Sequence, residues 1–135
     1  KENHLKMLGG GTSAIGKGIQ AVYSSLFSSK RPNKTRKNVL EVEVETVEQA
    51  HIAAAKFNEY GGLDGVLTPI IMLDNFTPSI ANKTYDKINN SALIEVSGGI
   101  EVNDLRHYKA DVISTSQLNR VVKPLDLSQK LTYIS

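Results

Sequence analysis

A short apolar run that ends in a carboxylate and an amide is the feature that most constrains the fold of this chain. Four consecutive apolar residues, Ile70 to Leu73, are followed at once by Asp74 and Asn75. An acidic residue is rarely placed against a core unless it has a partner or a function. The run therefore indicates a buried strand whose carboxyl end carries a polar pair.

The same arrangement recurs along the sequence. Strand-like segments carry or end in polar groups at Glu43, Asp74-Asn75, Ser97-Gly98-Gly99 and Ser114-Thr115-Ser116. Segments with the apolar spacing of helices separate them. Short strands that alternate with helices favour an α/β fold with a parallel sheet. Polar groups at the carboxyl ends of successive strands are how an α/β barrel builds an active site.

Periodicity and punctuation residues predict the individual elements. We expect helices over residues 14–27 and 47–60, a third that opens at Thr77-Pro78, a short one over 101–108 and a last one over 124–133. We expect strands over residues 39–44, 69–73, 92–96 and 111–114. The runs 70–73 and 93–96 do not alternate, which predicts strands covered on both faces.

Three polar or glycine-rich positions are predicted to begin or end helices. Thr12 and Ser13 offer N-cap oxygens to the first helix, and Thr46 offers one to the second. Gly61-Gly62 is predicted to end the second helix. The segment Gly11–Gly18 resembles a P-loop, but Gly18 stands where a hydroxyl should bind magnesium. We therefore interpret residues 9–13 as a loop and a cap.

Composition bounds the domain count and the class of protein. The 135 residues suffice for one domain but not for a complete eight-fold barrel, which needs about 250 residues. The net charge of +2 gives no argument for nucleic acid. The absence of cysteine excludes a disulfide scaffold and a thiolate metal site. No apolar run approaches the roughly 18 residues of a membrane span. The sequence starts at Lys1 and shows no targeting pattern, which suggests a fragment or a processed chain.

Two successive turns are predicted to bind phosphate. Ser97-Gly98-Gly99 follows one strand and precedes a helical segment, and Ser114-Thr115-Ser116 follows the next strand. Glycines allow close approach of the backbone to an anion, and free N–H groups can bind it. The alternative is a pair of ordinary turns, but their consecutive positions favour a phosphate cup.

Two carboxylates are the candidates for chemistry at the strand ends. Glu43 and Asp74 belong to strands that are consecutive in the sequence. A carboxylate pair in one mouth could hold Mg²⁺, accept hydrogen bonds from ribose hydroxyls or stabilise a developing cation. The alternative for Glu43, with Glu41 and Glu45, is the exposed face of an edge strand. Asp74 is the stronger candidate because it ends an uninterrupted apolar run.

The basic and histidine residues give weaker signals. The stretch Lys30–Lys37 could contact RNA or phosphate, but it has no interleaved aromatic residues and is better interpreted as a charged connecting loop. The three histidines, His4, His51 and His107, lack the spacing of metal ligands.

Six short segments in a fixed order resemble one known family. They are Lys1-Glu2-Asn3-His4-Leu5, Glu41–Glu45, Ile71-Met72-Leu73-Asp74-Asn75, Glu95-Val96-Ser97-Gly98-Gly99-Ile100, Asp111–Ser114 and Pro124–Ser128. Together they closely resemble the carboxyl-terminal part of the quinolinate phosphoribosyltransferases, also called nicotinate-nucleotide pyrophosphorylases (carboxylating).

This resemblance implies a fold and a reaction. The implied fold is an incomplete, seven-stranded, TIM-like α/β barrel with parallel strands, preceded by an open-faced α/β sandwich. Residues 1–135 would form the carboxyl-terminal portion of the barrel domain with about four βα units, so the amino-terminal domain and first barrel strands would be absent from this chain. The implied reaction converts quinolinate and phosphoribosyl pyrophosphate, with Mg²⁺, to nicotinate mononucleotide, pyrophosphate and carbon dioxide, in NAD biosynthesis. A cytoplasmic homodimer or higher homo-oligomer, with neither nucleic acid nor membrane as a partner, is also implied.

The resemblance also assigns roles to single residues. It implies that Lys1 contacts the anionic substrates, and that Glu43 and Asp74 approach the ribose and the metal. Those three residues would form the catalytic group. The residues that would bind the phosphate lie in the two turns and are Ser97, Gly98, Gly99, Thr115 and Ser116.

Several features of the family are missing from this sequence. Its Arg-Lys-Thr-Thr-Pro-Gly segment, its His-Arg pair and the substrate-binding arginine of its amino-terminal domain are absent, and Ser116 replaces a common glycine. These cations would hold the two carboxylates of quinolinate. Two alternatives therefore remain, namely another phosphate-binding barrel enzyme and a non-catalytic paralogue or subunit that binds phosphoribosyl ligands.

Overall fold

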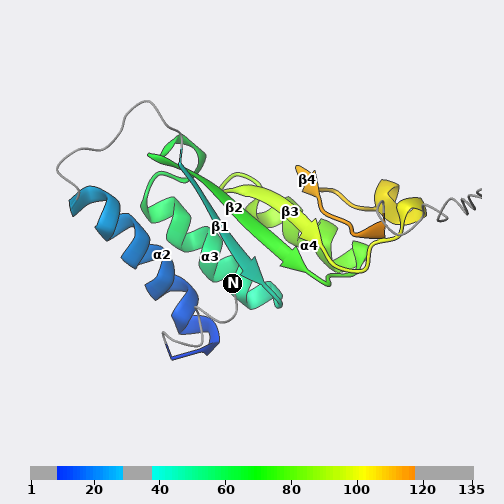
Figure 1. Cartoon of the computed structure of the whole chain (residues 1–135), viewed down its shortest axis with the longest axis horizontal. Helices are drawn as coiled ribbons and strands as arrows, with labels where there is room; N and C mark the ends of the chain where they lie inside the picture. The colour runs from blue at the N-terminus through cyan, green and yellow to red at the C-terminus, as the bar shows by residue number, and fades with distance from the viewer. Residues whose placement is uncertain (1–8, 29–37, 118–135) are drawn as a thin grey trace, which may run out of the picture.

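Helices and strands alternate along the chain in a computed structural model that describes residues 9–28 and 38–117 (Figure 1). The α-helices are α2 (Gly11–Ser28), α3 (Val47–Glu59) and α4 (Pro78–Ile88), and two short 3-10 helices are η1 (Gly62–Asp64) and η2 (Val102–His107). The strands are β1 (Asn38–Val44), β2 (Leu67–Asp74), β3 (Leu93–Ser97) and β4 (Val112–Ile113). The predicted alternation is confirmed, and the helix predicted over 124–133 lies outside the described residues.

The four strands form one parallel sheet in the order of the sequence, β1-β2-β3-β4. Connections between parallel strands are right-handed in nearly all proteins. Strands added one after another in the same direction therefore place their connecting helices on the same face. In agreement, α3 packs against β1 and β2, α4 packs against α3, and α2 lies alongside α3 (Figure 1). The predicted α/β class with a parallel sheet is confirmed.

The core lies between the helices and the face of the sheet that they cover, which we call the first face. Alternate residues of the strands are buried there, and so are the small and aromatic residues of α3, such as Ala53 and Phe57. Small alanines allow the helix to approach the sheet closely, and Phe57 fills the space between them. The buried strand residues of this first face are Val42, Val44, Leu67, Pro69, Ile71, Leu73, Ile94 and Val96.

The prediction that both faces of the central strands are covered was wrong for β2. Ile71 and Leu73 are fully buried, whereas Ile70, Met72 and Asp74 are only partly buried. The sequence run is apolar without a break, but the helices bury only one side of it. We call the other side the second face of the sheet. Its strand residues, by alternation and register, are Val39, Glu41, Glu43, Thr68, Ile70, Met72, Asp74, Leu93, Glu95, Ser97 and Val112.

Local hydrogen bonds explain where α3 begins and ends. The Thr46 hydroxyl accepts from the N–H of Gln49 at 3.2 Å, and the Gln49 side chain accepts from the N–H of Glu45 at 2.8 Å. The two bonds satisfy donors at the helix start and confirm Thr46 as the cap; they differ from a capping box because Gln49 accepts from Glu45, the residue before the cap. Gly61 follows the helix with a φ of 93°, which confirms the predicted glycine stop.

The start of α2 differs from the prediction. The helix begins at Gly11, so Thr12 and Ser13 lie inside its first turn and are not its N-caps. Ala14, Ile15, Ile19 and Tyr23 form its buried stripe. This stripe, rather than a polar cap, determines where the helix lies. The glycine-rich segment up to Gly18 is therefore helical, which rules out a P-loop.

The connection between β3 and β4 also differs from the prediction. The short helix expected over 101–108 is the 3-10 helix η2, and β4 is shorter than the expected strand 111–114. Asp111 explains the short strand, because its carboxylate accepts from the N–H of Ile94 at 2.8 Å where a backbone carbonyl would otherwise pair. The N–H of Ser114 donates to the Val96 carbonyl at 2.9 Å, so the two chains stay side by side beyond β4.

A buried phenol in α2 gives a test of this packing. Tyr23 is 0% exposed and stacks on Tyr60 with ring centroids 4.0 Å apart, and its hydroxyl has no hydrogen-bond partner among residues 9–28 and 38–117. An unsatisfied buried hydroxyl costs free energy, so Tyr23→Phe should raise the free energy of unfolding by about 1 kcal/mol. Urea denaturation of both proteins measures the change, and a loss of stability in the variant would contradict it.

The pH dependence of this effect has a defined sign. Burial raises the pKa of Tyr23, and the neighbouring Tyr60 raises it further. The unfolded chain therefore ionises first, and the wild type loses stability as pH rises above the ordinary tyrosine value of about 10. Below that pH Tyr23 is neutral in both the folded and the unfolded state, so the difference in pKa costs the wild type no stability. The stability advantage of Tyr23→Phe should accordingly grow above that pH.

Among the described residues, no helix has the length and apolar character needed to cross a membrane.

Candidate functional site

The carboxyl ends of the parallel strands bring the predicted polar groups to one edge of the sheet. Asp74, the last residue of β2, is the register partner of Ser97, the last residue of β3. Ser114 continues this edge beyond β4 through its bond to Val96. Polar groups that are far apart in the sequence therefore lie next to one another because each follows a strand of the same direction.

The two candidate carboxylates lie on the second face of the sheet. Glu43 is the register partner of Met72, and Asp74 lies two residues beyond Met72 on the same face. The two residues are therefore diagonal neighbours on adjacent strands. Both are partly buried. This arrangement allows both carboxylates to reach one ligand at the mouth of the sheet.

Asn75 connects Asp74 to the first predicted phosphate turn. Its side-chain amide donates to Asp74 Oδ2 at 2.8 Å, and its backbone N–H donates to the Ser97 carbonyl at 2.9 Å. Its φ of 57° places it in the left-handed region. Asn75 follows Asp74 at the end of the apolar run but is not among the predicted site residues. Its position directly after a predicted strand could have indicated its role, because asparagine tolerates the left-handed conformation that such turns require.

The first turn is held against Asn75. Gly98 has a φ of 127°, and a Cβ added to it would lie 2.5 Å from Asn75 Oδ1 and 3.2 Å from Asn75 Cα. A Cβ at Gly99 would meet nothing within 4 Å. Gly98 is therefore required by both backbone conformation and contact, whereas Gly99 leaves open space at the exposed side of the turn.

The second turn is tied to the first through Thr115. Its hydroxyl donates to the Ile100 carbonyl at 2.7 Å and accepts from the N–H of Gln117 at 3.1 Å. The two turns therefore form one continuous edge, as a shared phosphate cup requires. Because the Thr115 hydroxyl serves this contact, the backbone N–H groups of Thr115 and of the exposed Ser116 are the donors we expect to face an anion.

A buried acid beneath the turns was missed by the sequence analysis as a site residue. Glu95 is only 7% exposed, and the Ser114 hydroxyl donates to its Oε1 at 2.5 Å. This bond joins the middle of β3 to the start of the second turn. Buried carboxylates need hydrogen-bond partners, so an acid inside the apolar run 93–96 was the signal that could have revealed the contact.

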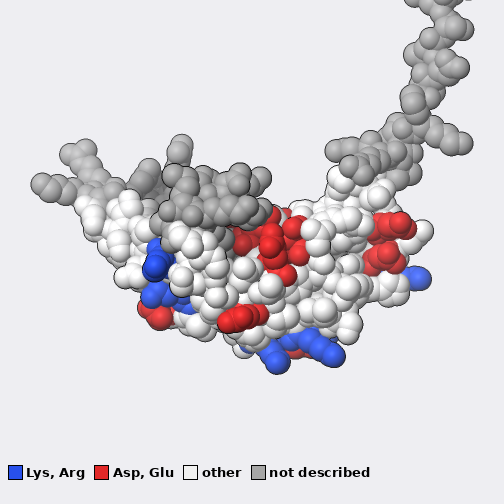
Figure 2. Space-filling view, turned by 90° about the horizontal axis from the view of Figure 1, so that it is seen from below, with Lys and Arg blue, Asp and Glu red and all other residues white. Residues whose placement is uncertain are grey.

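The second face carries a group of acidic residues. Glu41, Glu43, Asp74 and Glu95 lie on it. Figure 2 shows a cluster of Asp and Glu side chains near the middle of the face that it views. Within residues 9–28 and 38–117, no three His, Cys, Asp or Glu residues form a group that could hold a metal ion alone. Lys1, the remaining predicted site residue, lies outside the described residues.

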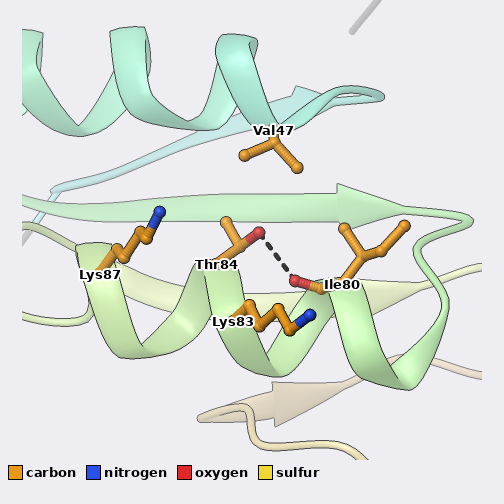
Figure 3. A pocket seen from close by; sticks show the side chains of 5 residues that line it. All are labelled: Val47, Ile80, Lys83, Thr84 and Lys87. Atoms are coloured by element: carbon orange, nitrogen blue, oxygen red, sulfur yellow. Dashed lines mark hydrogen bonds between the residues drawn. The ribbon is translucent and has the colours of Figure 1, made fainter.

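A separate groove lies on the helix-covered side of the sheet (Figure 3). Val47 of α3 and Ile80 of α4 provide its apolar walls, and Lys83 and Lys87 reach along α4 beside it. The Thr84 hydroxyl donates to the Ile80 carbonyl at 2.8 Å, which uses the donor of that hydroxyl within the helix. The groove contains none of the predicted site residues.

Comparison with known proteins matches the chain to one family. Residues 1–130 match the family described as quinolinate phosphoribosyl transferase, C-terminal domain. The chain is 34% identical over 119 residues to a probable nicotinate-nucleotide pyrophosphorylase (carboxylating) of Archaeoglobus fulgidus, a match that covers 82% of this chain and 42% of the relative. It is 28% identical over 138 residues to a protein of the same description from Methanocaldococcus jannaschii, covering 95% of this chain and 41% of the relative.

One solved structure has a similar fold. The fold is similar to that of a NadC deletion mutant crystallised in a cubic space group, with a TM-score of 0.62 and 28% sequence identity. That match covers 99% of this chain and 41% of the other. The chain therefore spans about two fifths of the length of the relatives it matches.

Proposed function

Because this chain belongs to the family of quinolinate phosphoribosyl transferase C-terminal domains, we propose that it forms the phosphoribosyl side of the active site of such an enzyme. The proposed reaction joins the ring nitrogen of quinolinate to the ribose of phosphoribosyl pyrophosphate. Pyrophosphate leaves, and loss of one carboxylate as carbon dioxide gives nicotinate mononucleotide for NAD biosynthesis. The names of the curated relatives support this reaction.

We propose that the four-stranded sheet is one arc of an incomplete, seven-stranded barrel. Its sequential strand order, with connecting helices on the first face, is the arrangement found in α/β barrels. Residues 1–135 would then be the carboxyl-terminal portion of the barrel domain. In that domain the second face would line the barrel, which accounts for strands whose second face carries carboxylates.

One observation supports the site most strongly, namely the register pairing of Asp74 with Ser97. It places a carboxylate beside the first residue of a glycine turn. A phosphoribosyl group has its 5′-phosphate and its ribose hydroxyls a few bonds apart. The turns Ser97-Gly98-Gly99 and Thr115-Ser116 would bind the phosphate, and Asp74 with Glu43 would face the ribose.

The two carboxylates would then stabilise the reacting ribose. Departure of pyrophosphate leaves positive charge at the ribose carbon that forms the new bond, and fixed negative groups beside it lower the barrier. Holding the 5′-phosphate in the turns fixes the orientation of that carbon toward the quinolinate nitrogen. Lys1 is proposed to contact the anionic substrates. A homodimer or higher homo-oligomer is proposed to complete the site.

Glu43 and Asp74 fit the proposed Mg²⁺ cofactor. Mg²⁺ is usually held by one or two carboxylates together with substrate phosphates, not by an all-protein cage. A diagonal carboxylate pair without a third acidic or histidine ligand among the described residues matches this pattern. When bound, Mg²⁺ would neutralise charge on the pyrophosphate that leaves.

Turnover of carboxyl-labelled quinolinate tests this function. The protein expressed from its natural gene is incubated with phosphoribosyl pyrophosphate, Mg²⁺ and quinolinate labelled at the 2-carboxylate. We expect release of labelled carbon dioxide in equal amount to nicotinate mononucleotide. A reaction without quinolinate and one with chelator are the controls. Neither product at saturating substrates would contradict the proposal.

One alternative function is binding without turnover. The groups proposed to hold the phosphoribosyl ligand, Asp74 and the turn that begins at Ser97, lie side by side within this chain. A protein of this kind could bind phosphoribosyl ligands without turning them over. Calorimetric binding of phosphoribosyl pyrophosphate in the absence of any product would support this alternative over the enzyme.

A further inference from the structure

We infer that Asn75 is a positioning residue, which holds the Asp74 carboxylate at a fixed place relative to the first phosphate turn. The inference deepens the proposed function and rests on it for its meaning in catalysis. Its geometric part rests only on the contacts of Asn75 with Asp74, Ser97 and Gly98.

The first contact fixes the carboxylate. The Asn75 amide donates to Asp74 Oδ2 at 2.8 Å. A carboxylate at the end of a strand can otherwise rotate about its side-chain bonds. An amide donor on the adjacent residue restricts that rotation and leaves Oδ1 as the oxygen that can turn toward a ligand. Hydrogen bonds of this kind orient carboxylates that bind metals or reacting groups.

The second contact fixes the position of Asn75 itself. Asn75 is the sole non-glycine residue with positive φ in the described ranges. Asparagine is one of the few residues that adopt this conformation at small cost. Its N–H donates to the Ser97 carbonyl at 2.9 Å, which extends the pairing of β2 with β3 by one residue. The chain turns immediately after this bond, so the amide points back to Asp74.

The third contact joins Asn75 to the turn. Asn75 Oδ1 occupies the space where a Cβ of Gly98 would stand, only 2.5 Å away. One side chain therefore donates to the carboxylate with its nitrogen and fills the gap beside the turn with its oxygen. A phosphoribosyl ligand would contact the Asp74 carboxylate with its ribose and the turn at Gly98 with its phosphate. Asn75 sets the distance between that carboxylate and that turn. Errors of that separation on the ångström scale are costly in catalysis.

Two substitutions separate the amide from the backbone conformation. Asn75→Gly keeps access to the left-handed conformation and removes the amide. Asn75→Asp keeps the size of the side chain but replaces the donor by a second carboxylate. The matched control is Asn82→Ala, because the Asn82 amide also makes two bonds between segments, to His107 and Lys109, away from the carboxyl ends of the strands.

The kinetic test is a double-mutant comparison in the natural protein. We expect Asn75→Gly to lower kcat about ten-fold, and Asn82→Ala to leave kcat of the folded protein unchanged. If Asn75 acts through Asp74, Asn75→Gly should change kcat little in the Asp74→Asn variant. An equal loss of kcat in both backgrounds would overturn the inference, as would a wild-type kcat in Asn75→Gly.

A readout without turnover separates this inference from the proposed function. Asn75 is exposed, so the readout is its geometry. In the ligand-free protein, NMR should show a side-chain amide proton of Asn75 shifted downfield by the carboxylate and the Asn75 side chain held in one rotamer. Both features should disappear in Asp74→Ala, and not in Asp86→Ala. Their absence in the wild type would overturn the positioning role even if quinolinate is turned over. Their presence without turnover would leave the positioning of Asp74 standing and overturn only the enzyme function.

Discussion

Replacing Asp74 by alanine is expected to lower kcat/KM for phosphoribosyl pyrophosphate by at least about ten-fold. Asp74 ends β2 beside the turn Ser97-Gly98-Gly99, which is proposed to bind phosphate, and its carboxylate is proposed to face the ribose and Mg²⁺. Removing a charge that stabilises a developing cation raises the barrier without changing the products. Steady-state kinetics with varied phosphoribosyl pyrophosphate measure the loss.

A matched variant shows whether the effect belongs to this position. Asp86→Ala removes an equally small acid from α4, where it pairs with Lys109 at 3.1 Å and both side chains are more than half exposed. Exposed ion pairs contribute little, so this control should keep the wild-type kcat/KM. Turnover by Asp74→Ala within about two-fold of wild type would show that Asp74 does not have the proposed role.

A methyl group at Gly98 is expected to cost about 2–4 kcal/mol of folding free energy. Gly98 has a φ of 127°, and its added Cβ would lie 2.5 Å from Asn75 Oδ1. Both the backbone strain and the contact with Asn75 would have to be relieved by moving the turn. Urea denaturation of Gly98→Ala, followed by circular dichroism, measures the loss.

The neighbouring glycine supplies the control for this prediction. Gly99→Ala places its Cβ in open space at a position without positive φ. Its free energy of unfolding should stay within about 0.5 kcal/mol of wild type. Equal stability of the two variants would mean that the contact between Gly98 and Asn75 does not hold the turn. The proposed phosphate cup would then lack the rigidity that this contact is expected to give it.

Local sequence signals predicted the parts of the fold that depend on local physics. Thr46 caps the start of α3 and Gly61 follows its end, and both could be predicted because capping bonds and positive φ involve only neighbouring residues. Pro78 stands in the first turn of α4 for the same reason. The positions of Asp74 and Ser97 at strand ends also followed from local pattern. Their proximity then required only that the strands be parallel and adjacent.

The features that the sequence did not predict depend on the register between segments. The bond from Ser114 to Glu95 joins residues 19 apart, and the carboxylate of Asp111 pairs with the N–H of Ile94 across 17 residues. Neither pairing can be derived from spacing alone. The contact of Asn75 with Gly98 likewise follows from the one-residue extension of β2 along β3.

The exposure of β2 shows a second limit of sequence patterns. An unbroken apolar run such as Ile70–Leu73 indicates burial on both faces, but the connecting helices cover only the first face. The apolar side chains Ile70 and Met72 stay partly exposed on the second face. An apolar residue type alone therefore does not determine which face of a strand the helices cover.

A crystal structure of the protein with phosphoribosyl pyrophosphate and Mg²⁺ would show directly where the phosphoribosyl group binds. We expect the 5′-phosphate at the backbone N–H groups of Gly98, Gly99, Thr115 and Ser116. We expect the ribose hydroxyls or Mg²⁺ at the carboxylates of Glu43 and Asp74. A ligand bound instead in the groove beside Lys83 and Lys87, with the turns empty, would contradict the assignment of the phosphoribosyl site to the carboxyl ends of these strands.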